Sequence, residues 1–187
     1  MRSYQLIESA PYCCVAASLE SIFKRHGYNK ITQYDIANYI GITVHVSDIN
    51  NMPLRLSNIV YTNDNTKVGM HLYNDTLNNM FHHFKLPFKE LYIGWQEITE
   101  WNIDSILNNI LDKDDAILLF DFGYLYHEDK IVGIGHSGLF ISLDNNHIVK
   151  YMSPGPRFLG IDNFESGDFV NAIKARKGGI SVITFNK

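Results

Sequence analysis

The hydrophobic pattern of this chain changes from helical to extended near residue 115, and that change constrains its fold class most strongly. Four segments before this point carry apolar residues at the helical period of about 3.6 and are expected to be helices: residues 15–26, 32–41, 74 or 75 to 84, and 102–111. Four later segments, bounded by turn residues, are expected to be strands: residues 116–126, 135–143, 147–152 and 180–185. Helices followed by an antiparallel sheet indicate the α+β class.

Shorter patterns fill the rest of the chain. A strand is expected at residues 88–93 and a short helix at residues 168–174. Residues 42–70 are rich in Asn, Asp, Thr and Ser, which predicts a loop with short pieces of structure. Long irregular segments of compact domains are often functional, so we expect this loop to form a lid or a cleft wall. No stretch has the composition of a linker, and residues 1–187 are expected to form a single domain.

Composition supports one buried core and excludes several classes of function. Hydrophobic residues make up 45% of the 187, which is ample for a folded domain. The net charge is -4 and there is no run of Lys or Arg, so neither a nucleic-acid partner nor a membrane partner is expected. No apolar run is long enough to span a bilayer, and the N-terminus lacks the apolar core of a signal peptide. We therefore expect a soluble cytoplasmic protein.

The two cysteines, Cys13 and Cys14, are adjacent. A disulfide between neighbours strains the intervening peptide, and two thiols without a Cys-x-x-Cys or His-Glu-x-x-His motif do not make a structural metal site. Cys14 opens the first expected helix, where unpaired backbone N–H groups and the helix dipole favour the nucleophilic thiolate. The alternative is a thiol that packs in the core as a small apolar side chain.

His136 is the second candidate, at the start of an apolar strand and beside two glycines, Gly135 and Gly138. Glycines near a functional side chain give room for a ligand or another backbone to approach. The alternative is a core histidine whose ring is hydrogen bonded to a neighbouring carbonyl. For Cys14 alone or His136 alone, the purely structural interpretation is favoured. The presence of both in one chain favours a reactive thiol with an imidazole as its base.

The order of these segments resembles the papain-like cysteine peptidase superfamily, and more closely its branch of bacteriocin leader peptidases, the double-glycine peptidases. Members of that branch open with a helix of the form Cys-Gly-Pro-Ala-Ala-Leu that is ended by Gly, and five residues match in register: Cys14, Ala17, Ser18, Leu19 and Gly27. The segments at 32–41, 136–141 and 148–154 resemble the family's next helix, its histidine strand and its following strand. Counting from Cys13 shifts Leu19 and Gly27 by one position, so Cys14 is the expected nucleophile and Cys13 a packing or N-cap residue.

The resemblance implies a papain-like α+β fold in which the Cys14 helix packs on the C-terminal antiparallel sheet. It also implies a cysteine-dependent acyl-transfer enzyme that works through a thioester, with Cys14 as nucleophile and His136 as general base. Water as acceptor would make it a peptidase or amidase, and an amine would make it an acyltransferase, acting on a peptide or on a small amide or acyl substrate. No metal or organic cofactor is implied. The alternative is a catalytically degenerate papain-like domain that binds a peptide or protein partner.

Two positions depart from the family pattern. The Asp or Asn that orients the imidazole falls at Ser153, with Asp144 as a substitute, and a hydroxyl does not stabilise an imidazolium as a carboxylate does. The Gln of the family's oxyanion hole falls at Glu8, and the nearest Gln is Gln5. An ionised Glu would oppose a developing oxyanion, where a hydrogen-bond donor is needed. Both departures favour the binding alternative.

Overall fold

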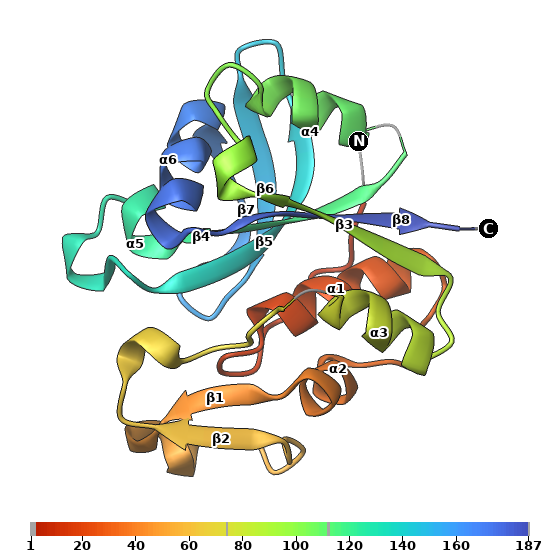
Figure 1. Ribbon diagram of the computed structural model, residues 1–187, viewed down its shortest axis with the longest axis vertical. Coiled ribbons are helices and arrows are strands. Elements are labelled where there is room, and N and C mark those ends of the chain that lie inside the picture. Colours follow the sequence, from red (N-terminus) through yellow and green to blue (C-terminus); the bar gives the residue numbers. More distant parts are fainter. Residues whose placement is uncertain (1–2, 74, 112, 187) are drawn as a thin grey trace.

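Helix α1 (Cys14–Arg25) lies at the centre of the fold (Figure 1). A six-stranded sheet lies on one side of it, and the elements formed by residues 33–62 lie on the other. This computed structural model describes residues 3–73, 75–111 and 113–186. The other helices are α2 (Gln33–Ile40), α3 (Thr76–His83), α4 (Ile103–Leu111), α5 (Phe122–Leu125) and α6 (Ser166–Arg176), with 3-10 turns η1 (Val46–Asn51), η2 (Asn65–Lys67), η3 (Trp95–Glu97) and η4 (Asp129–Ile131). The strands are β1 (Ile42–His45), β2 (Ile59–Thr62), β3 (Phe88–Gly94), β4 (Asp115–Asp121), β5 (Gly135–Leu143), β6 (Ile148–Pro154), β7 (Leu159–Glu165) and β8 (Gly179–Phe185).

The large sheet has the strand order β3-β8-β4-β5-β6-β7, and every neighbouring pair in it is antiparallel. Successive residues of a strand point to opposite faces. Ile117 and Leu139 therefore belong to the hydrophobic cluster around α1, whereas Phe120 and Phe140 belong to a second cluster that includes α6. The predicted α+β class, with the helix that begins at Cys14 packed on an antiparallel sheet, is confirmed.

Helix α1 forms where the sequence predicts it, with its ends shifted by one residue. It begins at Cys14, after Cys13 in the N-cap position, and it is buried continuously from Val15 to Phe23. The small side chains of Ala16 and Ala17 are fully buried, which allows close packing of this turn against its neighbours. The chain leaves the helix through Gly27, whose positive φ of 87° suits glycine.

Residues 42–70 contain the parallel pair β1–β2 as well as turns, which agrees with the predicted loop with short pieces of structure. The structure differs from the predicted elements in two places. Strand β7 was not predicted: it is an edge strand, its side chains alternate between exposed and half-buried, and polar residues interrupt it. The segment predicted as one strand to residue 126 turns into α5, because the Asp121 side chain accepts a hydrogen bond from the Tyr124 N–H. The predicted start at Asn74 lies outside the described residues, and α3 begins at Thr76.

A buried carboxylate joins α1 to the sheet and to the N-terminal segment. Asp115, at the start of β4, is 2% exposed. It accepts a hydrogen bond of 2.6 Å from the Tyr4 hydroxyl, forms an ion pair with Arg25, and lies 2.7 Å from His26 Nε2. Because a carboxylate buried this deeply needs such partners, the group fixes the C-terminal end of α1 on the sheet.

We predict that Asp115→Asn lowers the free energy of unfolding by roughly 2–4 kcal/mol, because it leaves Arg25 without its counter-charge. Urea denaturation followed by circular dichroism would measure the change. The matched control is Asp114→Asn, since the neighbouring Asp114 side chain has no hydrogen bond or ion pair among the described residues. Equal urea midpoints for the two variants would show that Asp115 and its partners do not hold the C-terminal end of α1 on the sheet.

Candidate active site

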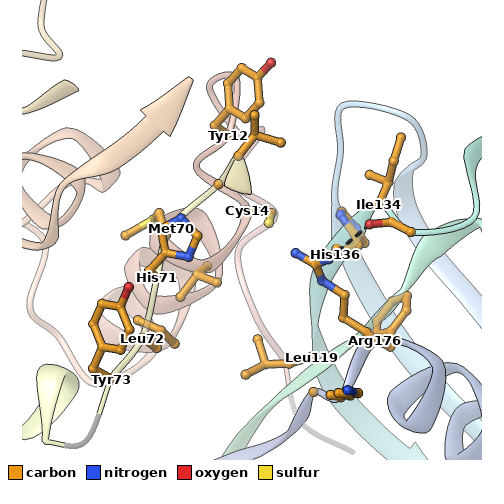
Figure 2. Close-up of a pocket in the computed structure, with 18 of the residues that line it drawn as sticks. Tyr12, Cys14, Met70, His71, Leu72, Tyr73, Leu119, Ile134, His136 and Arg176 are labelled. Atoms are coloured by element: carbon orange, nitrogen blue, oxygen red, sulfur yellow. Dashed lines mark hydrogen bonds between the residues drawn. The ribbon is translucent and has the colours of Figure 1, made fainter. Parts of the chain in front are cut away.

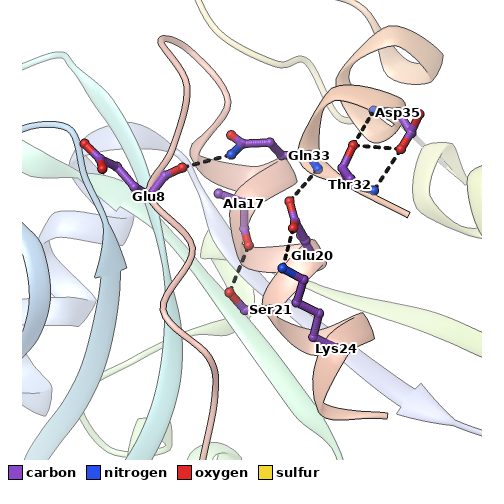
Figure 3. A network of polar contacts seen from close by, with 8 residues as sticks. All are labelled: Glu8, Ala17, Glu20, Ser21, Lys24, Thr32, Gln33 and Asp35. Carbon is purple, nitrogen blue, oxygen red and sulfur yellow. Dashed lines mark hydrogen bonds and ion pairs between the residues drawn. The ribbon is translucent and has the colours of Figure 1, made fainter. Parts of the chain in front are cut away.

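The segment before Cys14 is held by side chains from the first two helices (Figure 3). Gln33 donates from Nε2 to the Glu8 carbonyl at 2.8 Å, and its Oε1 accepts from the Ala10 N–H at 2.7 Å. The backbone N–H of Gln33 in turn donates to the buried Glu20 carboxylate at 2.7 Å. These bonds satisfy polar groups that the fold buries, and they fix the loop that delivers Cys14.

The Cys14 thiol lies at the open end of α1. Its residue is partly buried, and loss of hydration raises the pKa of the thiol. Polar contacts with Ser137 and with the backbone N–H groups of Ser137, Val15 and Cys14 itself act in the opposite direction and lower this pKa. They do so because N–H and O–H groups stabilise the thiolate. The neighbouring Cys13 is fully buried, and burial raises the pKa of its thiol to about 12.

His136 is fixed by a short chain of hydrogen bonds at the other wall of the site. Its Nε2 lies 2.9 Å from Ser153 Oγ, and that hydroxyl donates to the Phe158 carbonyl at 2.6 Å. A hydroxyl has one proton, so once that proton is given to Phe158 the Ser153 oxygen can only accept from His136. The Nε2 of His136 therefore carries the proton, and Nδ1 keeps the lone pair that a general base needs.

The surroundings of His136 keep its ring neutral. The edges of Phe120 and Phe122 pack near it, with centroid distances of 5.6 and 5.2 Å. Burial, with the positive charge of Arg157 as a smaller cause, lowers the pKa of His136 from 6.5 to about 4. The thiol and the imidazole are thus both neutral at physiological pH.

Cys14 and His136 face the same hollow from opposite sides (Figure 2). Two adjoining cavities, of about 370 and 640 Å³, are lined by both residues. We call the two together the cleft. Residues 48–70 contribute to its wall through Asp48 and Met70, as expected for the irregular segment. The Asp48 carboxylate accepts a hydrogen bond from Tyr12, which ties this wall to the loop before the cysteines.

The structure decides where the other predicted site residues lie. Ser153 is fully buried beside His136, whereas Asp144 is exposed and its carboxylate accepts from the backbone of its own turn. Gln5 and Glu8 are both exposed, and neither lines the cleft. The structure therefore does not bring either candidate for the oxyanion role to Cys14, because Gln33 holds Glu8 by its backbone carbonyl instead.

The two glycines near His136 make room for protein side chains. A Cβ at Gly138 would lie 2.5 Å from the ring of the buried Tyr151, and a Cβ at Gly135 would lie 2.5 Å from Arg176 Nε. The expectation that these glycines admit a close neighbour holds for both. The sequence offers no signal for Arg176 itself, because it lies 40 residues further along the chain at the end of another helix.

Ser137 is a further residue of the site, and the sequence pattern did not predict it. Its hydroxyl is fully buried, and among the described residues it has no partner with ordinary hydrogen-bond geometry. It interacts with the Cys14 thiol and lowers the pKa of that thiol. A polar residue in an otherwise apolar strand was the available signal, next to the histidine.

The described residues contain no group of three or more His, Cys, Asp or Glu side chains placed to hold a metal ion. Within the same residues, no helix is both long and apolar enough to cross a membrane.

An α1 thiol beside a histidine strand, with a helical part packed on an antiparallel sheet, defines the papain-like fold. The comparison with solved structures agrees: the chain is similar to a Bacillus anthracis protein provisionally assigned as a C39-like peptidase, with a TM-score of 0.62 and 13% sequence identity. The superposition covers 98% of this chain and 95% of that one. No family model and no curated protein matches the sequence. At this identity the likeness establishes the fold.

The low pKa of His136 predicts how stability depends on pH. In the unfolded chain this group takes up a proton near pH 6.5, but in the folded protein only near pH 4. Between these values the unfolded state binds more protons than the folded state. The contribution of His136 to the free energy of unfolding is therefore complete above pH 6.5 and is lost as the pH falls toward 4. The loss is expected to be roughly 3 kcal/mol. Urea midpoints at pH 7 and 4.5 would measure it, and His136→Gln should show a smaller difference. An equal difference in both proteins would contradict the prediction.

Ser137→Ala is expected to raise the pKa of Cys14 and to lower its alkylation rate at neutral pH by roughly two- to tenfold, the worth of one hydrogen bond to the thiolate. The measurement is the rate of iodoacetamide labelling at Cys14, resolved by mass spectrometry. Ser18→Ala is the matched control, because the buried Ser18 hydroxyl also has no partner within the described part of the chain but belongs to α1. Unchanged labelling in Ser137→Ala would remove Ser137 from the site.

Proposed function

We propose that this protein is a cysteine-dependent acyl-transfer enzyme in which Cys14 is the nucleophile and His136 the general base. The observation that carries the proposal is that His136, held through Nε2 by Ser153, lines the same cleft as Cys14. From this contact we infer the tautomer in which Nε2 carries the proton and Nδ1 is the base. The similarity of the fold to a protein provisionally assigned as a C39-like peptidase supports the same class of chemistry.

In the first step, Nδ1 of His136 takes the thiol proton as Cys14 Sγ attacks a substrate carbonyl. Negative charge develops on the carbonyl oxygen. The backbone N–H groups of Cys14 and Val15, at the start of α1, act on the sulfur together with those of Ser137. We assign the two helix N–H groups to this oxyanion in place of a side-chain donor. The imidazolium then gives its proton to the leaving amine or thiol, and a thioester on Cys14 remains.

In the second step, His136 deprotonates the acceptor that attacks the thioester. Water as acceptor releases an acid and makes the protein a peptidase or amidase. An amine as acceptor gives a new amide and makes it an acyltransferase. Either route regenerates the Cys14 thiol, and neither requires a metal or an organic cofactor.

Ser153 gives this site a weaker base than a carboxylate partner would. The hydroxyl orients the ring but brings no charge to stabilise the imidazolium. The thiol and imidazole therefore rest as a neutral pair, and the proton moves only as the substrate is attacked. A binding domain without catalysis is the second candidate, favoured by the exposure of Gln5 and Glu8 and by the neutral Ser153.

Native-state labelling with limiting iodoacetamide across pH tests the proposal. Cys14 is expected to react at pH 6 roughly tenfold or more faster than Cys13, and His136→Ala is expected to slow it by roughly tenfold or more, because the base is lost. Fragment mass spectrometry separates the two thiols.

Cys13 serves as the internal control in the same molecule, because it is buried and its thiol pKa is about 12. Labelling of Cys14 that is insensitive to His136→Ala at every pH, or that is no faster than labelling of Cys13, would reject the enzyme and favour the binding domain.

A further inference from the structure

The cleft is cationic although the chain as a whole is acidic. The net charge is -4, yet four cationic side chains line the two cavities: Arg176 and Lys177 in the smaller, Lys130 and Arg157 in the larger. Among the described residues that line the cleft, Asp48 is the one carboxylate, and it accepts a hydrogen bond from Tyr12. A hollow with low-dielectric walls and one sign of charge concentrates ligands of the opposite sign.

Arg176 is the cation with the most defined position. It is the last residue of α6, and its guanidinium packs against Gly135, the residue directly before His136. Figure 2 shows the Arg176 side chain near His136. Nη1 donates to the Gly133 carbonyl at 3.0 Å. A side chain at Gly135 would collide with the guanidinium, so the glycine and the carbonyl together fix an otherwise flexible arginine at the wall of the cleft.

The remaining donors of Arg176 have no partner among the residues that the structure describes. Apart from the bond to Gly133, the guanidinium makes no hydrogen bond or ion pair within the described part of the chain. A planar guanidinium held in this way presents parallel N–H groups that fit the two oxygens of a carboxylate or phosphate. Its orientation is fixed before a ligand arrives, which lowers the entropy lost on binding.

We propose that Arg176 binds an anionic group, a carboxylate or a phosphate, of the substrate whose acyl group reacts at Cys14. This inference rests on the proposed function and adds the chemical class of the substrate. The anion would lie in the smaller cavity, which Arg176, Cys14 and His136 all line, so the arginine holds the substrate at a distance from the carbonyl that is attacked.

Two alkylating probes of the same shape test this binding without knowledge of the natural substrate. Iodoacetate carries a carboxylate, whereas iodoacetamide is neutral, and both form a thioether with Cys14 as iodide leaves. The ratio of their rates at Cys14, divided by the ratio for the same thiol in the urea-unfolded chain, reports the attraction of an anion to the site. We expect this normalised ratio to exceed 1 in the native protein and to fall as the ionic strength rises.

Arg176→Gln is expected to lower the normalised ratio by about fivefold or more, since it removes a nearby charge from a partly buried site. Its rate with iodoacetamide reports the effect of the lost charge on the Cys14 thiolate, and the ratio of the two rates removes this effect. Lys174→Gln is the matched control: it removes the same charge from the same end of α6, at an exposed residue that does not line the cleft. Arg176→Lys, which keeps the charge and loses the planar fork, should lie between the two.

A ratio that is the same in Arg176→Gln and Lys174→Gln would overturn the proposal. Competition distinguishes the two anions: protection by inorganic phosphate at lower concentration than by acetate assigns a phosphate, and the reverse order assigns a carboxylate. If Cys14 reacts with neither probe, the proposed function fails, but the anion site is still tested by the rise of the urea midpoint with added phosphate. Loss of that rise in Arg176→Gln but not in Lys174→Gln supports the anion site. An equal rise of the urea midpoint in these two variants overturns it.

Discussion

The burial of α1 is the constraint on which the rest of this structure depends. Nine consecutive residues of the helix, from Val15 to Phe23, are buried, so the helix has almost no face left for water. A helix enclosed in this way must satisfy its two ends by other means. Asp115 and its partners hold the C-terminal end, and the N-terminal end opens into the cleft. The backbone N–H groups of the first turn and the Cys14 thiol both face the cleft at this end, because the rest of the helix is buried.

The tautomer of His136 depends on one hydrogen bond of a neighbouring hydroxyl. Ser153 donates its proton to the Phe158 carbonyl, and this bond determines which nitrogen of the His136 ring is protonated. A carboxylate in the same place would fix the same tautomer and add a charge. The protein has the orientation without the charge, and the low pKa of His136 follows from its burial and from the nearby Arg157. The site is therefore organised by geometry more than by electrostatics.

Much of the fold could be predicted from the sequence, because α1 and strands β4, β5, β6 and β8 have strong periodic patterns. The pairing of His136 with Ser153 also followed, since both positions match a known order of helix, strand and turn. The position of Gln5 and Glu8 outside the cleft could not be predicted, because the path of the loop that follows them depends on Gln33, a residue in another helix. Arg176 was missed for the same reason: it reaches Gly135 only through the packing of α6 on the sheet.

The position of Cys13 has a consequence for the redox chemistry of this site. A cysteine nucleophile is exposed to oxidation to a sulfenic acid, and in many proteins a second thiol then condenses with it to a disulfide that can be reduced again. Cys13 is adjacent in sequence, but it is fully buried in the core and its thiol pKa of about 12 keeps it protonated. An oxidised Cys14 would have no resolving thiolate beside it. Its reduction would depend on a small external thiol that can enter the cleft. In the absence of such a thiol, further oxidant would convert the sulfenic acid to the irreversible sulfinic state.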